Sequence, residues 1–245
     1  AIGIQYQQGL KDTLPASDLV EGLLNQTDRP PVYDEKTGEV LFAGSAIPHA
    51  NEVDEMAGID GLVSYHLWRE LGIPADNTNH DLRWGAVFES QFIWTLLVSG
   101  AVPPSHFSDC YDGGGYDRAV GMRQPPMYFR LGGSTIQGIT APGWSVLSRM
   151  FIENGRPCVN IGTGENVELP PEESQRRLDL TTPQWPLANV NWIGVNRDQG
   201  MLNPANHIQF KLARTMKEAL YAARVQAAAY DAMGFNVNYW GDHGL

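Results

Sequence analysis

Three short segments, far apart in the chain, carry side chains that could together hold one divalent metal ion. They contain Glu52, Asp81 and His207. Two carboxylates and an imidazole form a mixed oxygen and nitrogen ligand set, which is typical of sites for Mn²⁺, Mg²⁺, Fe²⁺, Co²⁺ or Zn²⁺. The spacing of these residues is not a motif by itself, so the prediction depends on the surroundings of each one.

Each of the three residues also has an ordinary structural explanation. Glu52 lies at the start of a predicted helix, where a carboxylate commonly caps the helix or interacts with its dipole. Asp81 could instead form a surface ion pair with Arg83. In a strand over residues 207–212, His207 faces away from the alternating apolar residues, and a lone histidine there more often forms hydrogen bonds than binds metal.

The predicted elements of the first part of the chain follow an α/β pattern. Its best helix runs from about residue 52 to residue 71 and ends at Gly72. Glu52 lies on the same helical face as the apolar stripe, whereas Asp54 and Asp60 point away from it. That stripe consists of Met56, Ile59, Val63 and Leu67. We therefore expect Glu52 to face inward.

The second part of the chain has short apolar runs separated by Gly and Pro, which predict a small antiparallel barrel or sandwich. Strands are expected there at residues 127–131, 135–140, 146–152, 158–162 and 188–193, with helices at 172–178 and 214–233, and one further buried strand is expected in the first part at residues 92–98. The predicted fold is α/β followed by an antiparallel β-barrel or sandwich with a C-terminal helix. Its expected domains are residues 1–105, with Glu52 and Asp81, and residues 106–245, with His207.

Composition narrows the class of protein. The chain has 245 residues, 42 % of them hydrophobic, and a net charge of −11. Because Lys and Arg form no basic face, nucleic acid is not an expected partner. No apolar run is long enough to cross a bilayer, and no signal peptide is evident, so we expect no membrane association. Cys110 and Cys158 lie far apart, which favours free thiols and a cytoplasmic location.

Three further features bear on binding and assembly. The Gly-rich turn before Tyr116 lacks the Lys-Ser/Thr of a phosphate-binding loop. Trp185, beside Pro186, could stack on a sugar ring, although packing is the favoured interpretation. The chain opens at Ala1 with residues typical of a buried strand, which predicts an upstream part or a companion chain.

Several segments, in order along nearly the whole chain, resemble the L-fucose isomerase family of the arabinose/fucose isomerase superfamily. The GENVELPP stretch at 164–171, Arg177, TPQWP at 182–186 and DGGGY at 112–116 are similar to its C-terminal half. EVDEMAG at 52–58, HDLR at 80–83 and NH at 206–207 resemble its metal-binding segments. The stretch between Glu52 and Asp81 is longer than in that family, and the loop at 29–38 and the tail after Leu212 do not resemble it.

The resemblance implies a metal-dependent aldose–ketose isomerase that acts through an enediol on a small sugar similar to L-fucose or D-arabinose. It implies Glu52, Asp81 and His207 as ligands of a divalent metal, with Mn²⁺ the expected ion, and Glu52 and Asp81 as catalytic residues. Sugar contacts are expected from Gln7, Tyr116, Trp185 and Asn206. The family also implies a homo-oligomer with sites near subunit boundaries.

Two other functions remain open from the sequence. The first is a metal-dependent sugar epimerase or lyase on the same scaffold, which would give no ketose from an aldose. The second is a non-catalytic sugar-binding or assembly subunit, which would need no metal.

Overall fold

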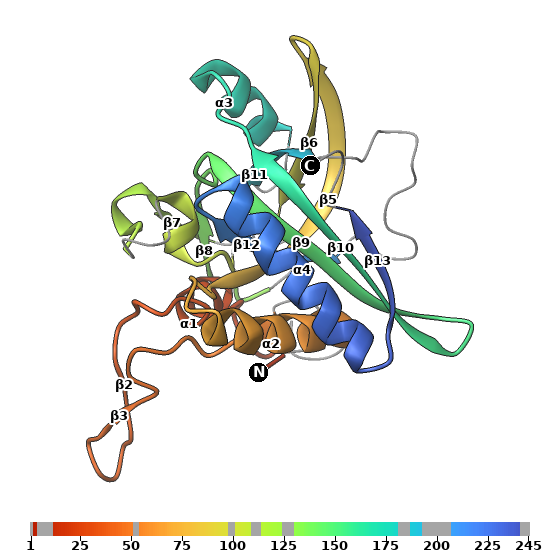
Figure 1. Ribbon diagram of the computed structural model, residues 1–245. Helices are drawn as coiled ribbons and strands as arrows, with labels where there is room; N and C mark the ends of the chain where they lie inside the picture. The colour runs from red at the N-terminus through yellow and green to blue at the C-terminus, as the bar shows by residue number, and fades with distance from the viewer. Residues whose placement is uncertain are drawn as a thin grey trace.

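A closed six-stranded antiparallel β-barrel forms the centre of the molecule (Figure 1). The computed structural model describes residues 2–3, 12–50, 54–97, 101–108, 114–123, 130–180, 187–192 and 207–240. In order around the barrel, the strands are β11 (Leu187–Trp192), β6 (Gln91–Leu97), β5 (Asn77–Phe88), β12 (His207–Ala213), β9 (Gly143–Glu153) and β10 (Arg156–Asn166). An antiparallel barrel is confirmed, but the predicted layout of an α/β part followed by a barrel holds only in part, since β5 and β6 come from the region expected to be α/β.

The barrel consists of two hairpins joined by two single strands. One hairpin is β5–β6 and the other is β9–β10. β12 lies between β5 and β9 on one side, and β11 lies between β6 and β10 on the other. The β10–β11 seam is short and pairs residues 164–166 with residues 190–192. β13 (Asn236–Trp240) lies outside the barrel, parallel to the first half of β10.

Alternating residues of β12 divide between two cores. Its apolar residues pack with Leu147 and Val190 in a buried cluster; they are Ile208, Phe210 and Leu212. Gln209 and Lys211 lie on the other face of the strand. They are buried as well, at 2 % and 0 % exposure, because helices cover that face.

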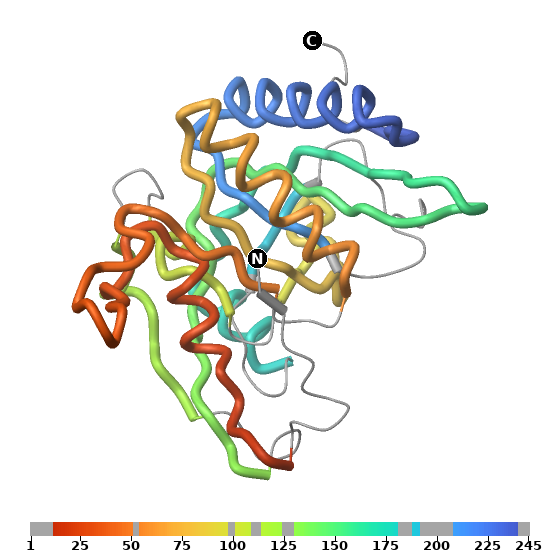
Figure 2. The backbone as a smooth tube through the Cα atoms, turned by 90° about the horizontal axis from the view of Figure 1, so that it is seen from below, coloured from red at the N-terminus to blue at the C-terminus, as the bar shows by residue number. Residues whose placement is uncertain are grey.

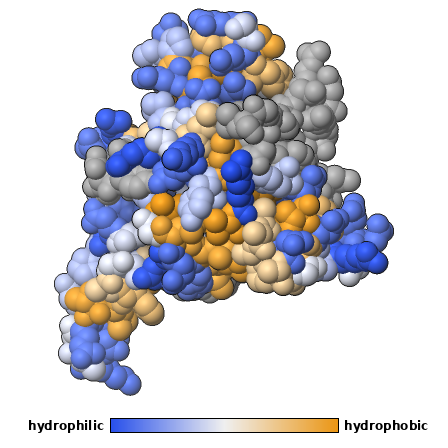
Figure 3. Space-filling view, viewed as in Figure 1, coloured by the Kyte–Doolittle hydropathy of each residue, from blue (hydrophilic) through white to orange (hydrophobic). Residues whose placement is uncertain are grey.

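The second core lies between the barrel and two helices, α2 (Glu55–Glu70) and α4 (Met216–Ala232) (Figures 1 and 2). It includes the fully buried Trp68 of α2 and Tyr230 of α4, packed against Val146, Val159 and Ile161 of the barrel. The outer surface over these helices is also rich in apolar residues (Figure 3). α4 confirms the predicted C-terminal helix.

The start of α2 differs from the sequence prediction. Asp54 is the N-cap, and its side chain accepts a hydrogen bond of 3.0 Å from the Ala57 backbone N–H. The helix therefore begins at Glu55, after Glu52 rather than at it. The predicted start near residue 52 is therefore about three residues too early, and Glu52 itself lies outside the described residues.

The buried face of α2 also differs from the predicted stripe. Ile59 of that stripe is 48 % exposed, whereas Asp60, predicted to point away, is fully buried. Small residues explain the rotation, because Gly61 lets the helix approach β12 closely. A Cβ at Gly61 would lie 2.9 Å from Gln209 Oε1. Close packing of the helix on β12 at this face therefore decides which side of α2 is buried, rather than the larger apolar side chains of the stripe.

Smaller elements surround one end of the barrel. β1 (Ile2–Gly3) pairs with β4 (His49–Ala50), β2 (Val32–Tyr33) with β3 (Val40–Leu41), and β7 (Val120–Arg123) with β8 (Ser134–Gln137). α1 (Asp18–Leu24) contacts β8, and the β2–β3 hairpin projects from the body (Figure 1). The 3₁₀ turns η2 (Pro104–Phe107) and η3 (Tyr116–Arg118) lie in contact. Most of the strand predicted at 127–131 lies outside the described residues.

The barrel takes strands from both sides of residue 105. β5 and β6 precede that position, and β9 to β12 follow it. The sheet therefore crosses the boundary expected between residues 1–105 and 106–245.

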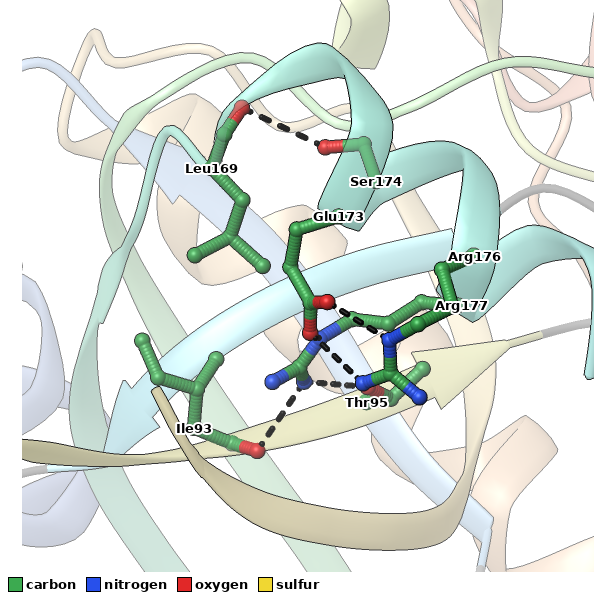
Figure 4. Close-up of polar contacts among 7 residues, drawn as sticks. All are labelled: Ile93, Thr95, Leu169, Glu173, Ser174, Arg176 and Arg177. Atoms are coloured by element: carbon green, nitrogen blue, oxygen red, sulfur yellow. Dashed lines mark hydrogen bonds and ion pairs between the residues drawn. The ribbon is translucent and has the colours of Figure 1, made fainter. Parts of the chain in front are cut away.

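The helix α3 (Pro171–Asp179) is anchored to the β5–β6 hairpin by one buried arginine (Figure 4). Arg177 Nε donates to Glu173 at 2.8 Å, and Nη1 donates to Thr95 Oγ1 at 2.8 Å and to the Ile93 carbonyl at 3.2 Å. Its guanidinium also lies over the Trp84 ring, 5.0 Å from the centroid.

Candidate functional site

The register of the barrel brings two of the predicted ligand positions together. In the antiparallel pair of β5 and β12, Asp81 is the direct partner of His207. Directly opposite positions in such a pair are nearest neighbours on one face of the sheet, with Cβ atoms about 4.5–5.5 Å apart. Residues from two distant segments thus meet at the start of β12.

Asp81 already has a partner in this structure. Its carboxylate forms an ion pair with the Arg83 guanidinium, and the Asp81 side chain is 15 % exposed. The register of β5 against β6 shifts between Leu82 and Trp84, so a β-bulge lies at this point. This ion pair is the non-metal explanation that the sequence offered for Asp81. A metal ion would have to compete with Arg83 for the Asp81 carboxylate.

Glu52, the third predicted ligand, lies outside the described residues. The nearest described residue after it is Asp54, whose carboxylate pairs with Arg149 of β9 at 2.6 Å. Arg149 follows Ser148, which is the β9 partner of Gln209 in β12. Asp54, the first described residue after Glu52, is therefore held by an ion pair to β9, the strand next to β12, at a point near the start of β12.

The residues expected to contact sugar are mostly outside the described part of the chain. Gln7, Trp185 and Asn206 all fall there. Tyr116 is described, on η3, and is 42 % exposed. Its hydroxyl donates to the Asp28 carbonyl at 2.5 Å, and burial followed by the Asp28 charge raises its pKa. Tyr116 therefore holds the loop after α1 in this structure.

The donor set that could hold a metal is incomplete in the described part of the chain. Among those residues, no group of three His, Cys, Asp or Glu side chains is placed to bind an ion. Asp81 and His207 occupy paired positions in the sheet, and a carboxylate with an imidazole is a residue combination that suits a divalent transition metal. A third donor would have to come from a segment such as the one that carries Glu52.

A buried charged network, which the sequence did not suggest, lies between the barrel and the helices. Asp60 Oδ1 accepts from the Tyr230 hydroxyl at 2.5 Å, and Oδ2 accepts from Ser148 Oγ at 2.7 Å. Lys211 Nζ lies 5.6 Å from the Trp68 ring centroid. Burial raises the pKa of Asp60 and lowers that of Lys211 to about 8. The positive charge of Lys211 opposes the first shift, and the negative charge of Asp60 opposes the second.

Two histidines lie next to the barrel core and are held neutral. His80 and His106 both contact the Phe210 ring, with centroids 4.9 Å and 5.9 Å away. Burial, and then the His106 charge, lowers the pKa of His80 to about 3. Burial also lowers the pKa of His106 to about 4. Although His80 adjoins Asp81 in sequence, neighbouring strand positions face opposite sides of the sheet.

The described residues also form two adjoining cavities, of about 320 Å³ and about 510 Å³. The first is lined by Ala213 at the end of β12, by Gly143 at the start of β9 and by Asn166 at the end of β10. His207 begins β12, and a strand of this length spans roughly 20 Å. The cavities therefore lie at the opposite end of the barrel from the Asp81–His207 pair.

In comparisons with known proteins, no family model and no curated protein sequence matches this chain. The resemblance to the L-fucose isomerase family therefore rests on the ordered segments quoted above. Among the described residues, no helix has both the length and the apolar character required to cross a membrane.

Proposed function

We propose that the chain is a cytoplasmic, metal-dependent aldose–ketose isomerase that acts on a small sugar such as a deoxyhexose or pentose. The observation that carries the proposal is the pairing of Asp81 with His207 in adjacent strands. The ordered resemblance to the L-fucose isomerase family adds support, because the same two positions match its metal-binding segments.

Glu52, Asp81 and His207 would hold the divalent ion, with Mn²⁺ the expected metal. When bound, such an ion supplies positive charge that polarises the sugar carbonyl and favours the developing enediolate. Glu52 and Asp81 would move the proton between the neighbouring carbons, because a carboxylate can act as both general base and general acid. Gln7, Asn206 and Tyr116 would bind sugar hydroxyls, and Trp185 would form an apolar wall.

The Arg83 ion pair has a defined part in this proposal. In the absence of metal, Arg83 neutralises the Asp81 carboxylate. Asp81 would exchange Arg83 for the metal as its partner, and the Arg83 side chain, which is 44 % exposed, could then return to solvent. The same ion pair favours the second candidate, a non-catalytic sugar-binding or assembly subunit, since a permanently paired Asp81 binds no metal.

Metal content and turnover, measured together, test the proposal. The protein should bind Mn²⁺ by calorimetry, convert an aldose to its ketose, and exchange the C2 proton with solvent. Asp81→Asn and Glu52→Gln should abolish turnover without loss of fold, and His207→Gln should weaken metal binding. Asp117→Asn, on η3, is the matched control for charge.

Three results would contradict the proposal. The first is full activity after complete metal removal, and the second is unchanged activity in Asp81→Asn. The third is sugar binding with no metal requirement, which would establish the non-catalytic alternative. Proton exchange without ketose formation would indicate an epimerase.

Assembly is part of the proposal. The apolar surface over α2 and α4 and the projecting β2–β3 hairpin, where Phe42 is 62 % exposed, support association with further copies of the chain (Figures 1 and 3). Native mass spectrometry should show an oligomer or a second polypeptide. A fully active 27.0 kDa monomer would contradict it.

A further inference from the structure

The two adjoining cavities share a wall formed by Arg118, Ala141 and Pro142. Both lie beside the end of the barrel where β9 begins and β10 ends. Neither includes Asp81 or any described residue proposed to act in isomerisation. They are therefore a separate feature of the molecule.

The first cavity has a positive lining. Arg118 and Arg214 both border it, and so does Asn166, the last residue of β10. Arg118 Nη1 makes only a long hydrogen bond of 3.4 Å to the Phe107 carbonyl, and in the described part of the chain no carboxylate pairs with it. In a chain with a net charge of −11, an arginine that faces a cavity without a carboxylate is a candidate anion site.

Asn166 adds a hydrogen-bond donor to this lining. The residue is 2 % exposed, and its Oδ1 accepts from Ser145 Oγ at 3.1 Å. Its Nδ2 has no partner among the described residues. A buried donor without a partner costs free energy, so a ligand oxygen that accepted from it would remove that cost.

The second cavity has a different chemistry. Thr140, 6 % exposed, has a hydroxyl with no partner among the described residues. Gln175 also borders this cavity, where its Nε2 donates to Asp179 at 2.8 Å and its amide oxygen remains as an acceptor. Glu168 also borders this cavity, so an anion would be repelled there. Neutral hydroxyl groups suit this lining, since amides, hydroxyls and carboxylates all form hydrogen bonds with them. Trp144 of the first cavity provides a half-buried ring of the kind that packs on a sugar face.

We propose that the paired cavities bind a sugar or polyol that carries an anionic group, either a phosphate or a carboxylate. The anionic group occupies the first cavity, between Arg118 and Asn166. The hydroxyl-bearing part extends into the second, beside Thr140. This site is distinct from the proposed isomerase centre and needs no metal.

Calorimetric titration of the metal-free protein with four probes tests the proposal: inorganic phosphate, glucose 6-phosphate, gluconate and glucose. Inorganic phosphate should bind. Either glucose 6-phosphate or gluconate should bind with higher affinity than inorganic phosphate, and whichever of these two binds more tightly identifies the anionic group. Arg118→Gln should weaken this binding by about tenfold or more, since it removes a charge-assisted hydrogen bond. Arg156→Gln, an exposed change of the same charge on the far β9–β10 turn, is the control and should leave binding unchanged.

Thr140→Val distinguishes the contributions of the two cavities, because the hydroxyl it removes has no partner among the described residues. It should weaken binding of the sugar anion severalfold and leave inorganic phosphate unaffected. Equal melting temperatures for all variants would exclude a folding defect. The proposal is overturned if no anion binds at about 10 mM, or if Arg118→Gln and Arg156→Gln behave alike. It is also overturned if glucose binds as tightly as the charged probes. None of these results depends on isomerase activity.

Discussion

The Tyr230 hydroxyl donates a 2.5 Å hydrogen bond to Asp60 Oδ1 and so joins α4 to α2 through a fully buried contact. Ser148 of β9 donates to the other oxygen of the same carboxylate. One aspartate thus connects two helices with the outer face of the barrel. Because burial raises the pKa of Asp60, the protonation of this contact is coupled to folding.

Replacing Tyr230 with Phe should destabilise the protein by about 1–3 kcal/mol, because the buried Asp60 oxygen loses its donor. Urea denaturation measures the free energy of unfolding. Tyr221→Phe is the matched control, since Tyr221 lies on the same helix and is 54 % exposed. Equal effects of the two changes would show that the buried hydroxyl contributes no stability.

Lys211 should make stability depend on alkaline pH. Its folded pKa of about 8 lies below the ordinary value of 10.5, so the unfolded chain binds more protons between these values. The free energy of unfolding should therefore rise with pH across that window, by at most about 1.4 kcal/mol per pH unit. The rise should be absent in Lys211→Met. Parallel pH profiles for the two proteins would show that Lys211 keeps its ordinary pKa in the folded state.

Neighbouring arginines of α3 should differ sharply in importance. Arg177 is fully buried, and Arg177→Met should destabilise the protein by roughly 1–3 kcal/mol for each buried group that loses its donor, namely Thr95 Oγ1 and the Ile93 carbonyl. Arg176→Met should cost no more than about 1 kcal/mol, since that side chain is 54 % exposed. Chemical denaturation compares the two variants, and hydrogen exchange in α3 locates the effect. Comparable losses would contradict the anchoring role of Arg177.

Removing Arg83 should tighten metal binding if Asp81 is a ligand. The Asp81–Arg83 ion pair is partly exposed, and such pairs contribute up to about 1 kcal/mol. Arg83→Gln should therefore increase Mn²⁺ affinity by up to about fivefold in a calorimetric titration. Arg156→Gln is the control for the change in net charge. Weaker metal binding in Arg83→Gln would indicate that Arg83 supports Asp81 rather than competing with it.

Sequence patterns predicted much of the barrel because its strands carry continuous apolar runs. β6, β9, β10 and β11 coincide with predicted strands to within a few residues. β5 was not predicted as a strand, because its first half is polar, including Asn77 and Asn79. Those residues are buried by the surrounding elements, at 5 % and 4 % exposure, which no local pattern reveals.

The buried face of α2 was assigned wrongly for a related reason. Periodicity selects the largest apolar residues, but packing on β12 depends on the small size of Gly61 and Ala57. The burial of Asp60 depends on donors from β9 and α4, which are distant in sequence. At the candidate site, the sequence supplied residue types, and only strand register could show that Asp81 and His207 are partners.

The arrangement of the barrel as two hairpins joined by single strands has a consequence for how the chain folds. β5–β6 and β9–β10 each pair nearby residues, so each hairpin can form early and alone. Neither can join the other into a closed sheet until β11 and β12 take their places between them. During synthesis, the pairing of Asp81 with His207 must therefore wait until β12 has left the ribosome.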